Sequence, residues 1–515
     1  MRNLFNSVKL FKPKQNFFDL SHSHITSMNA GDLVPILNID CIPGDRFNVG
    51  SEALVRFLPM IAPAMQRYDV YIHYYFTPYR ILWENFSKFI TNTKDQDTGF
   101  LPAMPTFQIA YDDSNFTKLL HYLGIPKPSE AGGDTTESVN ALMIAAYQKI
   151  WYEYYRDQNL QLVNENDIKL EDGDNTAYIG NFNVLRKRAW QHDYLTSALP
   201  WAQKGDPVTI PLSGFSDLPV KYYDPGNTAP TSTITATPST IDVPHDTEAD
   251  GITANRLYVE TADLEGTATI NDLRRAEAIQ KWYERLALGG SRLTEMIYAM
   301  FGVKSPDSRL QRPEYITGSR SPIQISEVLN TSGTFDAADP DVPTSPAQGS
   351  MAGHGIGIVG SNKGSYFVQE HGCIMAIASI MPKPMYFQGL EKHWLKREPT
   401  DFFTPQFANI GEQEVQNREA YAFHPDGYKT FGYNPRYSEY KYMNDRLSGV
   451  MTSELLFWTD ARKFDNLPTL SEEFISCDPA NRIFAVQDNS DKMICHFHNR
   501  IKVSRGMPKF GTPTI

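Results

Sequence analysis

One stretch constrains the fold more than any other: residues 68–77, YDVYIHYYFT. Apart from Asp69 they are aromatic or β-branched, and they contain no glycine and are followed by Pro78. Such a run predicts a long β-strand. Because alternate residues of a strand face opposite sides, one side carries Val70, Ile72, Tyr74 and Phe76, and the other carries Asp69, Tyr71, His73 and Tyr75. An apolar face opposite an amphipathic, aromatic face suits a sandwich, in which the second face meets a loop, another layer or a neighbouring subunit.

The preceding segment has the same character. Residues 45–58, DRFNVGSEALVRFL, alternate apolar and polar positions, with Phe47, Val49, Ala53, Val55 and Phe57 on one side. Two consecutive strands with a period of two predict an antiparallel β architecture near the N-terminus.

Composition and charge narrow the function classes. The chain has 515 residues and a formal net charge of −12, which argues against a protein whose whole surface binds nucleic acid, because phosphate contacts depend on Lys and Arg. No apolar run is long enough for a membrane span, and we expect no signal peptide. The four cysteines form no C-x-x-C pair, so the sequence predicts neither a zinc site nor a disulfide framework.

Any nucleic-acid contact must therefore be local, and the two ends of the chain are the candidates. Residues 1–15 and the tail from Lys492 onward are basic and contain no acidic residue. A basic arm with interleaved aromatic residues can follow a phosphate backbone and stack on bases, although an ordinary solvated terminus explains the composition equally well. The candidate nucleic-acid-binding residues are Arg2, Lys9, Lys12, Lys14, Arg500, Lys502, Arg505 and Lys509.

Helical and low-complexity segments interrupt the β pattern. Residues 137–156, 269–289 and 292–301 have helical spacing of apolar residues. Residues 207–268 are rich in Thr, Ser, Pro and acidic residues, which predicts an exposed protrusion or, alternatively, an interdomain linker. Residues 330–364 are rich in Gly, Ser and Pro and predict a flexible loop leading into a strand, and the GxGxxG within them lacks the strand-then-helix context of a dinucleotide site.

No catalytic, metal-binding or cofactor-binding constellation is predicted. Glu370 and His371 are adjacent, yet no nucleophile stands at a recognisable motif spacing. His22 and His24 share a strand face without a third ligand nearby. Residues 164–175 are acidic but break the EF-hand pattern.

Several motifs together resemble a known family, the major capsid proteins of the Microviridae, and most closely the gokushovirus branch. They are CIPGD at 41–45, FTPYRILWENFSKF at 76–89, DYLTSALPWAQKGDPV at 193–208, the helix–Gly–Gly–helix–SPDSRLQRPEY succession at 269–319, QEHG at 369–372 and FGY at 431–433. They occur in the family's order and cover most of the chain.

The resemblance implies a mainly β fold: an eight-stranded antiparallel viral jelly roll with large loop and helical insertions. It implies an N-terminal arm, residues 1–40, and a single jelly-roll domain, residues 41–515, whose insertions include the protrusion at 207–268 and the loop at 330–364. The function implied is that of a major capsid protein that assembles into a T=1 icosahedral shell around a circular single-stranded DNA phage genome.

The same resemblance implies partners and locations. The partners are further copies of the chain, with pentamers as intermediates, packaged single-stranded DNA, a small basic DNA-binding protein, a pilot protein, a scaffolding protein and a bacterial surface receptor. The protein would be found in the virion, and in the host cytoplasm during assembly. The residues expected on the host-attachment protrusion are Thr228, Thr231, Thr233, Thr235, Thr237, Asp242 and Asp246.

A second function remains open from the sequence: a carbohydrate-binding or carbohydrate-hydrolysing β-sandwich protein. Hydrolysis would need a pair of carboxylates in an aromatic cleft. The candidates for that pair are Asp112, Asp113 and Glu370.

Overall fold

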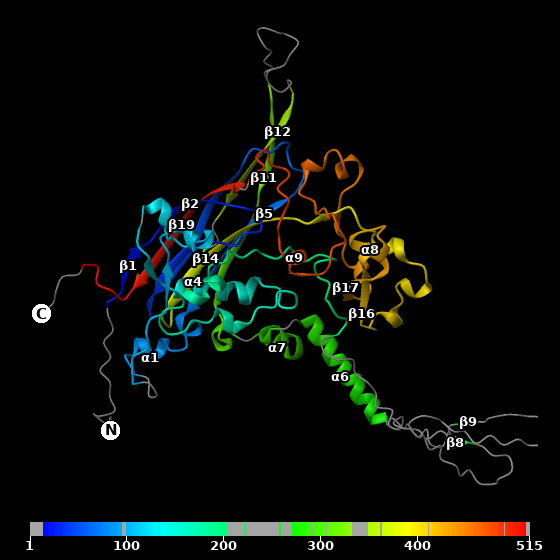
Figure 1. The fold of residues 1–515 in the computed structure, drawn as a ribbon, viewed down its shortest axis with the longest axis horizontal. Helices are drawn as coiled ribbons and strands as arrows, with labels where there is room; N and C mark the ends of the chain where they lie inside the picture. Colours follow the sequence, from blue (N-terminus) through cyan, green and yellow to red (C-terminus); the bar gives the residue numbers. More distant parts are fainter. Residues whose placement is uncertain are drawn as a thin grey trace, which may run out of the picture. The chain divides into compact units, whose positions relative to one another are not determined.

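The computed structural model divides the chain into two compact units, residues 1–202 with 290–515, and residues 203–289. Within them the structure describes residues 14–94, 99–132, 134–203, 221–222, 257–258, 270–289, 292–304, 306–331, 349–360, 363–409, 411–488 and 490–510. Figure 1 shows the arrangement of the helices and strands.

The first unit is built on two antiparallel sheets. Sheet I has the order β1-β19-β4-β12-β11, with β2 also paired to β19 and β13 also paired to β4. Its strands are β1 (Asn16–Asp19), β2 (His22–Met28), β4 (Arg46–Phe57), β11 (Gln324–Leu329), β12 (Met351–Val359), β13 (Gly364–Phe367) and β19 (Met493–Arg505). Sheet II has the order β10-β5-β14-β3, with β3 (Val34–Cys41), β5 (Tyr68–Pro78), β10 (Glu314–Pro322) and β14 (Gly372–Pro382). This mainly β, antiparallel sandwich with helical insertions confirms the predicted fold class.

The core lies between the sheets, where the alternation in the sequence predicts it. Val70, Ile72, Tyr74 and Phe76 of β5 are buried in the same cluster as the inward residues of β4 and β19. The second face of β5 meets another layer: Tyr75 belongs to a separate buried cluster with the insertions that follow it. β14 is buried along its whole length because both of its faces are covered.

A buried polar group joins the two sheets. Asn499 of β19 is fully buried; its Nδ2 donates to the carbonyl oxygen of Ile36 in sheet II at 3.0 Å, and its Oδ1 accepts from the Ser51 hydroxyl at 2.5 Å. Ser51 also shares a hydrogen bond with the Tyr74 hydroxyl of sheet II. A buried network of this kind is stabilising only while each member is satisfied.

The segment predicted as a loop at 330–364 contains a strand instead. Residues 351–359 form β12, which pairs with β11 and β4. The glycines that suggest a loop are required by close packing: a Cβ at Gly355 would lie 2.8 Å from the Phe57 ring, and one at Gly353 would overlap the carbonyl oxygen of Ala62. The GxGxxG motif therefore belongs largely to a strand, and it is followed by β13 and not by a helix.

The segment predicted as the N-terminal arm, residues 1–40, contains strands in its described part, residues 14–40. The structure places β1, β2 and most of β3 within that range. β1 and β2 both pair with β19, so their positions depend on a strand at the other end of the chain.

Insertions cover the outer side of sheet II. They contain β6 (Thr106–Ile109), β7 (Glu137–Asn140), α1 (Phe86–Ile90), α2 (Lys118–Tyr122), α3 (Pro128–Ala131), α4 (Leu142–Ile150) and α5 (Ile179–Phe182). The helix predicted over 137–156 begins later, because residues 137–140 pair with β6 and the Asn140 side chain accepts from the Leu142 amide at 2.8 Å. α7 (Leu293–Phe301) matches its predicted range closely.

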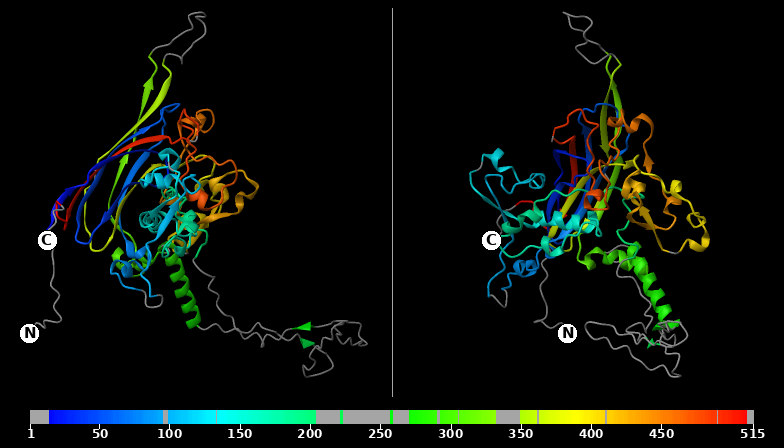
Figure 2. Two further views of the ribbon diagram at one scale, coloured as in Figure 1. Left: turned by 60° about the vertical axis from the view of Figure 1, so that its left-hand side comes forward. Right: turned by 45° about the vertical axis from the view of Figure 1, so that its right-hand side comes forward.

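A further group of insertions has its own small core around Val415, Phe431 and Phe474. Its elements are β15 (Met385–Tyr386), β16 (Glu412–Gln416), β17 (Thr430–Pro435), β18 (Asp445–Arg446), α8 (Asn417–Ala420) and α9 (Glu472–Ile475). In Figure 2 (left) the insertions lie on one side of the sandwich, and the sheet that contains the red strand β19 forms the other side.

The second unit contains α6 (Ile270–Gly289) and the short antiparallel pair β8 (Lys221–Tyr222) and β9 (Leu257–Tyr258). α6 confirms the helix predicted at 269–289. No helix in the described part of either unit is long and apolar enough to cross a membrane.

Candidate functional site

The two basic ends of the described chain meet at one edge of sheet I. β1 pairs antiparallel with β19, so that Asn16 lies opposite Arg505 and Asp19 opposite Lys502, and Figure 1 shows the two strands side by side. Exposed Lys14 immediately precedes β1, and exposed Lys509 follows β19. The structure therefore brings together two predicted basic segments that are far apart in the sequence, while Arg2, Lys9 and Lys12 lie outside the described residues.

Arg500 and Lys502 are on the outer face of sheet I. Along β19, Ile501 and Val503 are buried while Arg500 and Lys502 are exposed. Arg500 forms an ion pair of 2.9 Å with Glu52 on the neighbouring strand. An exposed ion pair of this kind contributes little to stability, so Arg500 can leave Glu52 to contact a polyanion. Lys502 is exposed on the same face and is accessible as well.

Arg505 is different, because its guanidinium is held inside the protein. Its Nη2 and Nε lie 2.7 and 2.9 Å from Oδ2 of Asp45, whose side chain is buried. Nη2 also donates to the carbonyl oxygen of Asp40 at 3.1 Å. These contacts give Arg505 a structural role.

The sequence reasoning did not single out Arg46 and Phe367, which lie on the same outer face as Lys502. The alternation of residues 45–58 contained the signal for Arg46, since it places Arg46 on the side opposite Phe47. The signal for Phe367 is absent from its local sequence, because only the pairing of β13 with β4 brings it beside Arg46.

The predicted protrusion residues, Thr228, Thr231, Thr233, Thr235, Thr237, Asp242 and Asp246, all lie outside the described residues.

The three carboxylates considered for glycan hydrolysis have structural partners. Glu370 accepts from Nε and Nη2 of Arg80 at 2.6 and 3.1 Å. Asp113 accepts from the Ser129 amide at 3.1 Å, and Asp112 accepts from the Ser114 amide at 3.1 Å. Hydrogen bonding to Ser114 and Ser129 lowers the pKa of both aspartates, which opposes a role as a general acid near neutral pH.

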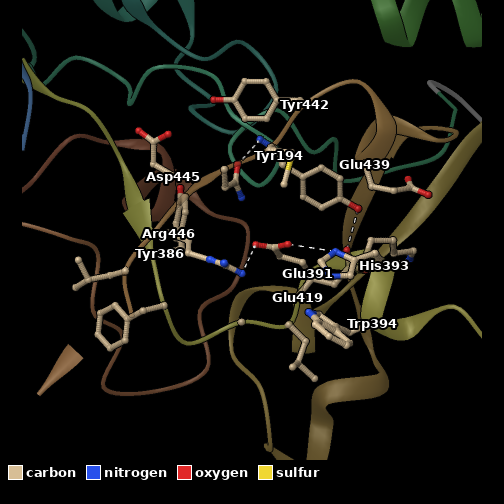
Figure 3. A pocket seen from close by; sticks show the side chains of 17 residues that line it. Tyr194, Tyr386, Glu391, His393, Trp394, Glu419, Glu439, Tyr442, Asp445 and Arg446 are labelled. Carbon is tan, nitrogen blue, oxygen red and sulfur yellow. Dashed lines mark hydrogen bonds and ion pairs between the residues drawn. The ribbon is translucent and has the colours of Figure 1, made fainter. Parts of the chain in front are cut away.

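A cavity of about 190 Å³ among the insertions has an aromatic and acidic lining that includes Tyr194, Trp394 and Tyr442 (Figure 3). Figure 3 shows Glu391 between Arg446 and His393. The four carboxylates of the lining are paired with cations: Glu391 with Arg446 at 3.7 Å, Glu419 with Lys392 at 3.1 Å, Glu439 with Lys396 at 3.2 Å and Asp445 with Lys383 at 2.7 Å.

Glu419 is the buried member of this set. Burial raises its pKa, while Lys392 and the hydrogen bond from the Tyr194 hydroxyl, 2.8 Å long, act in the opposite direction. Glycoside hydrolysis needs one carboxylic acid and one carboxylate facing the same bond. In the described lining all four carboxylates are instead paired with cations. Nor do three or more His, Cys, Asp or Glu side chains gather anywhere in the described chain to form a metal-binding group.

Comparison with known proteins agrees with the fold. The family model described as capsid protein (F protein) matches residues 7–515. Similar proteins are named capsid protein VP1 in three phages. The one from Chlamydia phage 1 is 29% identical, with 100% of this chain and 98% of that protein covered. The one from Bdellovibrio phage phiMH2K is 30% identical, with 91% and 89% covered, and the one from Spiroplasma virus 4 is 28% identical, with 96% and 94% covered.

These similarities confirm the resemblance inferred from the motifs and exclude the hydrolytic alternative. The chain belongs to the phage capsid protein (F protein) family of the Microviridae and is a major capsid protein, a structural component of the virion and not an enzyme.

Proposed function

We propose that copies of this capsid protein assemble into a T=1 icosahedral shell that encloses a circular single-stranded DNA genome. The observation that carries the proposal is the family match over residues 7–515 together with the antiparallel sandwich. A sandwich of this kind gives each copy a rigid body from which insertions can contact its neighbours.

Exposed aromatic residues on the insertions support self-assembly. Trp394 is 69% exposed, and Phe402 and Phe403 are each 55% exposed. Aromatic side chains are enriched in protein–protein interfaces and dominate their energetics. In the shell these side chains would be buried against neighbouring copies.

The enclosed genome is supported by the basic residues at the β1–β19 edge. Lys14, Arg500, Lys502 and Lys509 are all exposed there, and counterion release makes such clusters favourable contacts for phosphates. Arg2, Lys9 and Lys12 would extend this cluster along the N-terminal arm. A small basic DNA-binding protein would neutralise further phosphates, because the capsid protein itself carries a net charge of −12.

Host attachment is the proposed role of residues 207–268. Their Thr-rich and acidic composition suits an exposed surface, and Thr228, Thr231, Thr233, Thr235, Thr237, Asp242 and Asp246 are the residues proposed to meet a bacterial receptor. A pilot protein and a scaffolding protein complete the proposed partners, and assembly would take place in the host cytoplasm from pentamers.

Sedimentation and negative-stain microscopy of the expressed protein, with and without single-stranded DNA, test this function. Uniform icosahedral particles, or pentamers that convert to them, are the expected result. A protein that stays monomeric even when it is co-expressed with the other proteins of its phage would contradict the proposal.

A further inference from the structure

The two sheets of the sandwich differ in how their outer faces are covered. β14 of sheet II is buried at each of its positions, because insertions pack on its outer side. In sheet I, alternate residues of β19 and β4 are exposed, among them Lys502, Arg500 and Arg46. Sheet I therefore presents a face that the described part of the chain leaves in contact with solvent.

One row of side chains crosses four strands of this face. The register places Phe17 of β1 opposite Ser504 of β19, Ser504 opposite Arg46 of β4, and Arg46 opposite Phe367 of β13. We call these four residues the Phe17–Phe367 row. Neighbouring strands are about 4.8 Å apart, so the row is roughly 14 Å long.

The row ends in two exposed aromatic rings. Phe17 is 80% exposed and Phe367 is 48% exposed. The guanidinium carbon of Arg46 lies 5.4 Å from the centre of the Phe367 ring. Single exposed apolar side chains are common on protein surfaces, but here two exposed rings stand in one row with a cation, and Phe367 lies directly beside it.

The next row along the strands adds charge and hydrogen-bonding groups. It consists of Asp19, Lys502, Asn48 and Ser365, which are also register partners. The single acid of this row, Asp19, lies opposite Lys502. Residues 1–15 carry four cations and no acid, and they lead directly into β1.

We propose that the Phe17–Phe367 row, together with Lys502, binds the packaged single-stranded DNA, with bases stacked on Phe17 and Phe367 and phosphates in contact with Arg46 and Lys502. Aromatic platforms beside cations are the recurring solution for binding single strands without sequence preference, because every base has a face that can stack. A second copy of the chain is a poorer occupant, since the exposed Lys502 and Asp19 flank the row and Lys and Asp are depleted from the centres of protein–protein interfaces.

This inference rests on the proposed enclosure of single-stranded DNA, and a binding measurement on the full-length, unassembled protein tests it separately. The probe is a fluorescein-labelled thymidine oligonucleotide, and affinity is read from fluorescence anisotropy. The double variant Phe17→Ala/Phe367→Ala is compared with Phe423→Ala, which removes a ring that is 95% exposed on an insertion. All three side chains are exposed, so thermal unfolding should be unchanged in each variant.

The double variant should bind the oligonucleotide about 30-fold more weakly or worse, because it loses two stacked bases and each contributes at least about 1 kcal/mol. Phe423→Ala should bind as the wild type does. Lys502→Gln should make the slope of log affinity against log salt shallower by about 0.7, the expected loss of one phosphate contact to a single strand. Lys429→Gln, at an exposed cation beside Asp426 on an insertion, should leave that slope unchanged.

Two outcomes would overturn the inference while leaving the shell function intact. One is closed, DNA-filled wild-type particles with no loss of oligonucleotide affinity in the double variant. The other is a double variant that binds the oligonucleotide normally but no longer forms particles, which would make the row a contact between copies. A wild type that forms no particles even when it is co-expressed with the other proteins of its phage would refute the proposed function, and the oligonucleotide comparison would still decide whether the row binds single strands.

Discussion

Arg505 forms an ion pair with Asp45, although the two residues lie near opposite ends of the chain. The guanidinium reaches Oδ2 of Asp45 with two donors, at 2.7 and 2.9 Å, across 460 residues of sequence. The Arg505 side chain is 17% exposed and that of Asp45 is 1% exposed. The pair joins the end of β19 to the start of β4, and so holds the C-terminal strand against its neighbour in sheet I.

Replacing Arg505 should destabilise the fold. Arg505→Ala leaves the Asp45 carboxylate buried without a cation, and breaking a buried pair from one side costs about 3–5 kcal/mol of unfolding free energy. Urea denaturation of the unassembled full-length protein measures this loss. Lys502→Ala, three positions earlier and exposed, should cost less than about 0.5 kcal/mol. Equal stability of the two variants would mean that the pair contributes nothing.

Gly31 should tolerate no side chain. Its φ is +88°, and a Cβ there would overlap the carbonyl oxygen of Cys477. Gly44 has a similar φ of +95° but open space around the position of a Cβ. Replacing Gly44 by alanine therefore measures the cost of backbone strain alone, without a clash. Gly44→Ala should cost about 1–2 kcal/mol, the penalty of a left-handed conformation.

Gly31→Ala should lower the unfolding free energy by several kcal/mol more than Gly44→Ala, or prevent folding. The yield of folded protein and its midpoint of thermal unfolding decide this. If both variants lose the same stability, the overlap with Cys477 is relieved by a small movement and carries no cost.

Asn499 should be needed for the contact between the two sheets. Asn499→Leu keeps a similar volume but removes two hydrogen bonds of the network, while the Ser51 hydroxyl keeps Tyr74 and the Ile36 carbonyl keeps His24 as a partner. At about 0.5–1.5 kcal/mol for each lost hydrogen bond, the variant should lose about 1–3 kcal/mol of unfolding free energy. Asn48→Leu, on the exposed face of β4, is the matched control and should change stability by less than about 0.5 kcal/mol. Denaturation curves that coincide for the two variants would show that the buried network is dispensable.

His73 should make stability depend on pH. Burial lowers its pKa to about 4, with a further contribution from the positive charge of Arg188, whereas an unperturbed histidine titrates near about 6.5. Between these two values the unfolded chain takes up a proton that the folded chain does not. Stability is therefore lost as the pH falls through this window, by about 3 kcal/mol at its lower end.

The comparison with His73→Gln isolates this contribution, because glutamine does not titrate. The Tyr155 hydroxyl lies 2.7 Å from Nδ1 of His73, and the glutamine side chain can still accept a hydrogen bond from this hydroxyl. On going from about pH 7 to about pH 4, the wild type should therefore lose more unfolding free energy than His73→Gln. A difference that stays constant over this range would contradict the lowered pKa.

The sequence by itself determined the strands whose two faces differ in polarity. β4 and β5 follow from alternation, since a strand exposes successive residues to opposite sides whatever its partners are. α6 and α7 follow from helical spacing and the Gly-Gly that separates them. The family motifs, which occur in order along the chain, were sufficient to recognise a capsid protein.

Only the tertiary structure decided which strands meet. The Gly-rich residues 351–359 form β12 because Phe57 and Ala62 approach too closely for side chains, a condition invisible in the local sequence. Residues 137–140 leave the predicted helix because β6 offers them hydrogen bonds.

The same distinction separates the basic residues. Arg500, Lys502 and Arg505 look alike in the sequence, yet strand pairing puts the first two on an open face and gives the third a buried carboxylate. Phe17 and Phe367 come to lie in one row with Arg46 only through the register of four strands. Pairing between distant strands depends on the whole core being buried at once, and no local pattern of residues specifies it.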